Sequence, residues 1–217
     1  MSDVRVRYTT LEIGGMDIHI RMLRDIRQFQ DDSNIAKKLG ISSAAWPIFG
    51  VIWPSGKVLA HLMLDYHIQG KRILEVGCGI GLASLVLNKR SADVTATDHH
   101  PETERFLVYN TELNGGEAIP FVRTGWQNLT DDRLGTFDLI IGSDLLYESE
   151  HIDPLAAFIN QHGRRHCEVV IVDPGRGYHA KFSRKMGSLG YSHTRDKPEN
   201  TDYLDKKFKG WIMSYSR

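Results

Sequence analysis

The feature that most constrains the fold of this chain is a glycine-rich segment placed between a short apolar run and a helix-like stretch. The segment reads Ile73-Leu-Glu-Val-Gly-Cys-Gly-Ile-Gly81, and the β-branched run 93–97 follows it after a helical stretch at 81–88. Strand, glycine loop, helix and second strand in this order predict a βαβ unit, whose two strands are parallel. Glycines let a ligand approach the backbone closely, and a helix N-terminus offers unpaired N–H groups. We therefore expect a ligand-binding loop at 77–81.

The rest of the chain continues to alternate between strand and helix patterns. Helices are expected from Ser55, as a cap, to Tyr66, over 101–113, and over 178–189 before Gly190. Strands are expected at 72–76, 119–123, 137–141, 169–172, near 191 and at 208–215, and the basic segment 162–166 is expected to be a solvated turn. Such alternation predicts a doubly wound, mostly parallel α/β sheet. The last two strands follow each other without a long helix, which predicts an antiparallel pair at the C-terminus.

The first 45 residues have a different pattern. Apolar and polar residues alternate from Met16 to Met22, as in a half-buried strand, and a similar alternation with Val4, Val6 and Tyr8 precedes it. Gly14-Gly15 lies between the two runs and suits a tight hairpin turn. A short helix is expected over 33–39, with Ser33 as a cap and Gly40 past its end. We expect an N-terminal hairpin and connector at 1–45 and a second unit at 46–217.

Charge and composition exclude several classes of function. Lys plus Arg and Asp plus Glu number 27 each, so the net charge is zero, whereas a domain that grips a phosphate backbone is usually basic. The chain has only two cysteines, which excludes a disulfide framework or a cysteine-rich zinc site. His99 and His100 are adjacent, point apart and have no further ligand at a suitable spacing, so no metal is expected. No apolar run approaches the ~20 residues that span a bilayer. We expect a cytoplasmic protein without nucleic-acid or membrane partners.

The spacing within the glycine loop indicates which ligand it takes. Glycines stand at 77, 79 and 81, whereas the dinucleotide fingerprint needs its third glycine at position 82, which is Leu82. Glu75 lies in the strand just before the loop, where a carboxylate suits a cationic ligand better than a pyrophosphate. Asp98 ends the second strand, where a carboxylate can bind both hydroxyls of a ribose. A ribose together with a positive group describes S-adenosylmethionine. An NAD-binding oxidoreductase and a purely structural turn are the alternatives.

Further candidate residues lie outside the loop. Trp53 and Trp126 can each pack on an adenine or stand near a sulfonium, which aromatic faces attract, or can simply be large core residues. Asp144 and Tyr147 occur in Gly142-Ser-Asp-Leu-Leu-Tyr-Glu148, beyond the end of the strand at 137–141. Open α/β sheets bind ligands at that edge. The alternative for this pair is a helix-capping Asp and a packing Tyr.

Together these motifs resemble the class I, seven-β-strand methyltransferases, and within them the lysine methyltransferase family (methyltransferase family 16). The resemblance covers residues 45–150 well and the last third loosely. It rests on the segment around Trp53, the 75–81 loop, Asp98, the stretch from Asn110 to Asn114, Trp126 and the Asp144-x-x-Tyr147 motif. It implies a seven-stranded, Rossmann-like sheet. It also implies S-adenosylmethionine as cofactor, held by residues of the loop and its neighbours: Trp53, Glu75, Gly77, Gly79, Gly81, Asp98, Trp126 and Ser143.

The resemblance further implies the reaction. Asp144 would lie beside an incoming amine and Tyr147 would shape the pocket, so that the enzyme methylates a lysine side chain of a protein. Separately, we expect a monomer. Asp173-Pro-Gly-Arg176 is similar to bacterial members of the wider family, some of which carry a nicotinamide methyltransferase label. A small-molecule N-methyltransferase, acting on a nicotinamide-like amine or heterocycle, therefore stays open. A catalytically silent binding module is a further alternative, against which the intact motifs argue.

Overall fold

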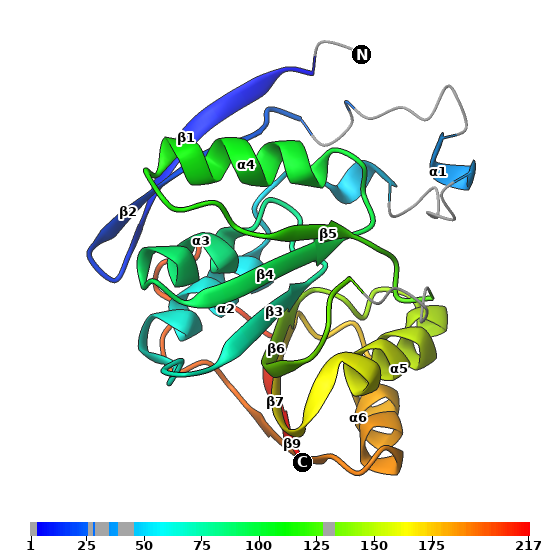
Figure 1. Ribbon diagram of the computed structural model, residues 1–217. Coiled ribbons are helices and arrows are strands. Elements are labelled where there is room, and N and C mark those ends of the chain that lie inside the picture. Colours follow the sequence, from blue (N-terminus) through cyan, green and yellow to red (C-terminus); the bar gives the residue numbers. More distant parts are fainter. Residues whose placement is uncertain (1–3, 26–27, 29–34, 39–45, 128–132) are drawn as a thin grey trace.

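The elements of the fold follow the expected order along the chain (Figure 1). The structure is a computed structural model that describes residues 4–25, 28, 35–38, 46–127 and 133–217. Its helices are α1 (Ile35–Lys38), α2 (Pro54–Asp65), α3 (Leu82–Lys89), α4 (Thr103–Leu113), α5 (Ile152–His162) and α6 (His179–Ser188), with short 3₁₀ turns η2 (Trp46–Ile48) and η3 (Ser149–His151). Its strands are β1 (Val6–Ile13), β2 (Met16–Leu23), β3 (Arg72–Val76), β4 (Asp93–Asp98), β5 (Phe121–Arg123), β6 (Phe137–Ser143), β7 (Gly163–Asp173), β8 (Ser192–Asp196) and β9 (Trp211–Ser216).

A seven-stranded sheet forms the centre of the described structure, in the order β5-β4-β3-β6-β7-β9-β8. Strands β5, β4, β3, β6 and β7 run parallel, and β9 pairs antiparallel with both β7 and β8. The predicted doubly wound sheet with a C-terminal antiparallel pair is confirmed. The strand order reverses between β3 and β6, and in such sheets a crevice opens beyond the carboxyl ends of the strands at that point.

Helices cover both faces of the sheet, because alternate residues of each central strand point to opposite sides. Ile73 of β3 packs in the same cluster as α2, α3 and α4, whereas the next residue, Leu74, packs with α5 and α6. Residues on both faces of β6 and β7 are buried in the same way, as expected for parallel strands. The short apolar runs in the sequence therefore correspond to strands buried between two helical layers.

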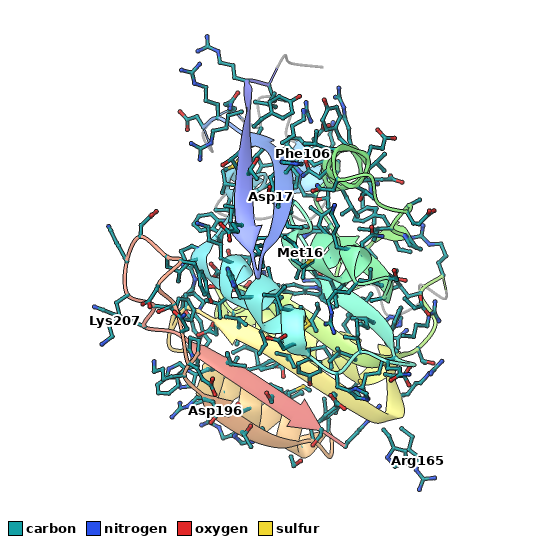
Figure 2. The ribbon with its side chains drawn as sticks, turned by 90° about the vertical axis from the view of Figure 1, so that its left-hand side faces the viewer. Met16, Asp17, Phe106, Arg165, Asp196 and Lys207 are labelled. Carbon is teal, nitrogen blue, oxygen red and sulfur yellow. The ribbon has the colours of Figure 1, made fainter. Side chains whose placement is uncertain are left out.

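The predicted N-terminal hairpin is also confirmed. β1 and β2 form a separate two-stranded sheet that turns at Gly14 and Gly15, and Figure 2 shows it standing against α4. Ile18 and Ile20 are fully buried, and they join the hydrophobic cluster of the main sheet. Tyr8, by contrast, is 57% exposed rather than on a buried face, and its hydroxyl hydrogen-bonds the Tyr109 hydroxyl of α4 at 2.9 Å.

Three local expectations were wrong or lie outside the described residues. Ser55 does not cap α2: Trp53 is the N-cap residue and Pro54 takes the first helical position, which proline favours, so Ser55 is already inside the helix. The segment 162–166 is not a solvated turn, because His162 is the buried end of α5 and β7 begins at Gly163. The short helix is seen at Ile35–Lys38, but its expected ends, Ser33 and Gly40, lie outside the described residues.

Candidate active site

The carboxyl ends of four neighbouring parallel strands meet at one cavity. Its volume is about 330 Å³, within the range of small-molecule sites. It is lined by the loop after β3, the end of β4, the segments that follow β6 and β7, and the stretch before α2. The lining residues are Ile48, Phe49, Trp53, Gly77, Gly79, Asp98, His99, His100, Trp126, Ser143, Asp144, Leu145, Tyr147, Glu148 and Arg176.

Most residues predicted from the sequence lie on this wall. Trp53, Gly77, Gly79, Asp98, Trp126, Ser143, Asp144 and Tyr147 all line the cavity. Glu75 lines a smaller neighbouring cavity of about 70 Å³, whose wall also includes Trp53, Gly77, Gly79 and Ser143. Gly81 lines neither of these two cavities. The sequence motifs therefore come together, with Glu75 and Gly81 set back from the main wall.

The glycine loop is shaped by close approaches as well as by turns. Gly77 has a φ of +61°, and a Cβ there would come within 2.6 Å of the Leu145 side chain, which packs over the loop. Gly81 has a φ of +74°, and a Cβ there would come within 2.4 Å of Leu107 in α4. Gly79 also has a positive φ, of +57°, but a Cβ there would meet open space. Gly79 thus keeps its backbone accessible to the cavity, whereas Gly77 and Gly81 are needed for packing.

Asp98 is fixed by two backbone donors, one from the glycine loop and one from the segment after β4. Its Oδ2 accepts a hydrogen bond from the Gly79 N–H at 2.9 Å, and its Oδ1 accepts one from the His100 N–H at 2.8 Å. The residue is only 8% exposed, and the His99 ring nitrogen lies 3.6 Å from Oδ1. A carboxylate offers about four lone-pair sites, so each oxygen retains capacity for a further donor. Asp98 can therefore accept hydrogen bonds from a ligand in the cavity.

Glu75 has a different environment from the one expected. Its Oε2 accepts hydrogen bonds from the Ser84 N–H at 2.8 Å and from the Ser84 hydroxyl, at the first turn of α3. The side chain is buried, and burial raises the pKa of Glu75 to about 7, although the two hydrogen bonds from Ser84 oppose the shift. In this structure Glu75 therefore secures the start of α3 behind the glycine loop.

Aromatic side chains form a large part of the cavity wall. The Trp53 indole donates to the Ile48 carbonyl at 3.1 Å, which fixes the ring across the segment before α2. On another part of the wall, the rings of Trp126 and Tyr147 both meet the His151 ring edge-on, at centroid distances of 5.3 and 4.6 Å. Burial raises the pKa of Tyr147 above its usual range, so this phenol is neutral at physiological pH.

His100 is buried in the wall of the cavity, just before α4. Its ring stacks on Phe49 at a centroid distance of 4.1 Å, and the Trp46 ring lies 4.6 Å away. Burial lowers the pKa of His100 to about 4, against the opposing effect of Asp98, so the ring is neutral. The backbone N–H of His100 donates to Asp98, so this residue helps to hold a carboxylate of the cavity wall. Across the described residues, no three His, Cys, Asp or Glu side chains are grouped so that they could hold a metal ion.

Asp144 has an unusual backbone conformation and a charged partner. Its φ is +56°, rare for a residue other than glycine, and its N–H donates to the Val172 carbonyl at the end of β7, at 2.9 Å. Both carboxylate oxygens are bound by Arg176: Nε lies 2.9 Å from Oδ1 and the terminal nitrogen Nη2 lies 3.1 Å from Oδ2. The backbone therefore fixes where Asp144 stands, and Arg176 fixes how its carboxylate is oriented.

Several wall residues were not selected from the sequence. Phe49 and His100 stood in segments that the sequence singled out, but nothing local indicated that their rings stack. Arg176 follows β7 in Asp173-Pro-Gly-Arg176, so its position after a buried parallel strand was the signal that could have identified it.

Comparison with known proteins identifies the family. The sequence profile of the lysine methyltransferase family matches residues 35–182, more than half of the chain. The chain belongs to the lysine methyltransferase family. This matched region includes every strand end that lines the cavity.

Individual relatives share between a quarter and a third of their aligned residues with this family member. It is 33% identical to the electron transfer flavoprotein beta subunit lysine methyltransferase of Xenopus laevis over 141 residues, which are 63% of this chain and 55% of that protein. It is 26% identical to the calmodulin-lysine N-methyltransferase of Arabidopsis thaliana over 202 residues, 87% of this chain and 65% of that protein. These matches thus span about half to two thirds of the relatives' length.

Solved structures show the same fold. The ribosomal protein L11 methylase of Lactobacillus delbrueckii subsp. bulgaricus superposes with a TM-score of 0.60 at 21% identity, covering 77% of this chain and 80% of that one. The family member therefore has the Rossmann-like methyltransferase fold. Within its described residues, no helix is long and apolar enough to cross a membrane.

Proposed function

We propose that this protein is an S-adenosylmethionine-dependent methyltransferase that N-methylates a lysine side chain of a protein. One observation carries the proposal: the glycine loop with Asp98 and the Asp144-x-x-Tyr147 motif line a single cavity, in a chain of the lysine methyltransferase family. The relatives named above modify protein lysines, which supports a protein as the acceptor.

The wall residues fit this cofactor. Gly79 presents backbone without a side chain, Asp98 has acceptor capacity for the ribose hydroxyls, and aromatic rings offer faces to a cation. Trp53, Gly77, Trp126 and Ser143 would complete the site, with Glu75 and Gly81 supporting the loop from behind. When bound, S-adenosylmethionine supplies an electrophilic methyl group.

The reacting amine would be positioned by Asp144. Methyl transfer is an in-line displacement, so the protein contributes mainly by orienting the reactants and excluding water. Asp144 can accept a hydrogen bond from the amine and is held rigidly by Val172 and Arg176. Tyr147 is a neutral, partly buried phenol that lines the cavity near Asp144. These two residues are the proposed acceptor-binding pair.

We propose the cytoplasm as the setting, supported by the free thiols of Cys78 and Cys167. The zero net charge supports a protein acceptor rather than nucleic acid or a membrane surface.

The proposed function is tested with methyl-tritiated S-adenosylmethionine and an extract of the source cells. Purified calmodulin and electron transfer flavoprotein beta subunit serve as two defined acceptors. Protein-bound and small-molecule label are counted separately, with the Asp98→Ala variant as control. We expect a discrete labelled protein band that disappears in the control, and lysine as the modified residue on mass spectrometry. Label only in the small-molecule fraction, or no transfer, would contradict a protein-lysine methyltransferase.

A further inference from the structure

The geometry points to Arg176 as a positioning residue that keeps the acceptor amine unprotonated beside Asp144. This inference rests on the proposed function, because it assigns a role to a residue of the same site. Asp144 alone presents a difficulty: a lysine amine has an ordinary pKa near 10.4, and a neighbouring carboxylate favours its charged form. The ammonium has no lone pair with which to attack. An enzyme that binds the amine through a carboxylate with no neighbouring positive charge therefore stabilises the ammonium form, which cannot react.

The contact between Arg176 and Asp144 removes most of this difficulty. The guanidinium bridges both carboxylate oxygens, at 2.9 and 3.1 Å, and both residues line the cavity. Arginine stays protonated throughout the physiological range. An amine that donates to Asp144 thus meets a pair with no net charge, instead of a single negative charge. Two lone-pair sites of the carboxylate are used by Arg176, and the others remain to accept the N–H of the amine.

The carboxylate of the pair is largely shielded from water. The Asp144 side chain is 13% exposed, whereas the Arg176 side chain is 45% exposed. A charge on the shielded carboxylate is screened less than a charge in open water. The backbone N–H of Asp144 donates to the Val172 carbonyl, which fixes the main chain that carries the carboxylate.

Other charged groups around the pair do not replace Arg176. The acidic neighbours are Asp98 at the end of β4, Glu148 after Tyr147, and Asp173 at the end of β7. The basic neighbours are His99, which is near Asp98, His151, which pairs with Glu148 at 3.3 Å, and His179 of α6. Burial lowers the pKa of His151, so its ring is largely neutral near pH 7. Arg176 is therefore the permanent positive charge among these named groups.

The expected chemistry follows from this charge balance. The bound ammonium releases its proton to solvent, and the nitrogen keeps the electron pair that methyl transfer requires. Removal of the Arg176 charge leaves Asp144 uncompensated, so the ammonium is stabilised and the pKa of the bound amine rises. Transfer within the complex then requires a higher pH. A residue that only held the shape of the site would lower the rate equally at every pH.

The test is a single-turnover measurement with enzyme in excess. The acceptor is the protein band labelled in the source-cell extract, and saturation is checked by doubling the enzyme, so that the rate reports the bound complex. Rates are measured from pH 6.5 to 9.5 for the wild type, Arg176→Gln and Arg176→Lys. Arg165→Gln is the matched control, because Figure 2 shows this arginine projecting outward from the molecule, and it stands at the start of β7, whereas the cavity lies at the other end of that strand. Calorimetry with S-adenosylhomocysteine verifies that each variant folds and binds the cofactor product.

We expect Arg176→Gln to move the rising limb of the rate profile upward by about one pH unit, with a rate about tenfold lower near pH 7 and a smaller deficit at pH 9.5. Arg176→Lys keeps the positive charge, so the rising limb of its rate profile should stay at the wild-type pH. The affinity for S-adenosylhomocysteine should stay within about twofold of the wild type in both Arg176 variants. A uniform loss at all pH values, or a rate increase, would overturn the inference while leaving the proposed function intact. If Arg176→Gln fails to fold, Arg176→Met takes its place. Absence of any labelled band with the wild type would overturn both proposals.

Discussion

Two carboxylates in the same cavity have different tasks, and their contacts separate them. Asp98 is held by the N–H groups of Gly79 and His100, on the side of the glycine loop. Asp144 is held by Arg176 and by the backbone of β7, on the side of β6. Substitutions at the two positions should therefore affect different steps of the reaction.

Asp98→Ala removes the acceptor proposed for the ribose hydroxyls. Hydrogen bonds to a charged group contribute about 1.5–3 kcal/mol, and 1.4 kcal/mol is tenfold in affinity, so S-adenosylhomocysteine should bind at least ~10-fold more weakly. Isothermal titration calorimetry measures this. The melting temperature of the free variant is the control, because Gly79 and His100 also lose a partner. Unchanged affinity would show that the ribose binds elsewhere.

Asp144→Ala should act on turnover instead. Misplacement of the reacting amine by about 1 Å can cost about 100-fold in rate, so we expect a loss of that order in kcat on the true acceptor. S-adenosylhomocysteine affinity should remain within a few-fold of the wild type, since Asp144 is on the other side of the cavity. Steady-state kinetics and calorimetry together check both parts. Normal turnover would remove Asp144 from its proposed role.

Glu75 makes stability depend on pH in a predictable direction. Its pKa is about 7 in the folded protein, against an ordinary value of 4.5, so the folded state binds the proton more tightly than the unfolded state does. The contribution of Glu75 to the free energy of unfolding is therefore full below about pH 4.5 and is lost as the pH rises through about 7. The difference in unfolding free energy, wild type minus Glu75→Gln, should fall by about 2–3 kcal/mol between pH 5 and pH 8.

Urea denaturation of both proteins at the two pH values measures this difference. His100, whose pKa is lowered to about 4, has the opposite effect between pH 6.5 and 4, but it is present in both proteins and cancels. A pH-independent difference would mean that Glu75 stays ionised against its burial.

At the scale of elements, two asparagines of helix α4 hydrogen-bond the backbone along one edge of β2, where a further strand would otherwise pair. The Asn110 amide accepts from the Arg21 N–H at 2.7 Å and donates to the Arg21 carbonyl at 3.2 Å. The Asn114 amide does the same with His19, at 2.9 and 2.7 Å. Residues four apart on a helix share a face, and residues two apart on a strand expose groups on the same edge. The Asn110–Asn114 spacing thus matches the edge of β2, which would otherwise present unpaired backbone groups.

Asn114→Ala should therefore destabilise the protein. It leaves a partly buried N–H and C=O of His19 without partners, which costs about 1–3 kcal/mol for each unsatisfied group. Urea unfolding measures the loss, and Glu112→Ala, an exposed substitution on the same helix, should change stability by less than about 0.5 kcal/mol. Equal effects of the two variants would contradict the edge-sealing role.

At the scale of the whole molecule, the hairpin and the α/β sheet share one hydrophobic cluster. Ile18 and Ile20 of β2 belong to the cluster that contains Ile73, Leu139 and Val170 of the main sheet. A two-stranded hairpin is marginal by itself in water, so its persistence depends on this packing. The molecule should then unfold as one cooperative unit.

Hydrogen exchange with mass spectrometry tests this cooperativity. Peptides covering β2 (16–23) and β6 (137–143) should lose protection at the same urea concentration, and Asn114→Ala should shift both together. Early loss of protection in β2 alone would indicate a separately unfolding hairpin. Chain ends and surface turns are excluded from the comparison, because they open locally in most proteins.

Local patterns in the sequence were enough to predict the sheet and the position of the site. Strand and helix periodicity is local, and the carboxyl ends of parallel strands converge in any doubly wound sheet. Residues that follow such strands, namely Gly77, Asp98 and Asp144, were therefore predicted to meet, and they line one cavity. The hairpin was predicted for the same reason, since its alternation and its Gly14-Gly15 turn are both local.

Which side chains become partners follows from the packing of the folded chain. Arg176 reaches Asp144 across 32 positions of sequence and Asn110 reaches Arg21 across 89. Glu75 accepts hydrogen bonds from Ser84 at the start of α3, and His100 stacks on Phe49, a ring from a distant segment. Such choices depend on which elements lie side by side after folding, and a local pattern contains no information about them. Sequence motifs thus predicted which residues line the site. Packing determined how buried each of these side chains is, which charged group lies beside it and how it is oriented.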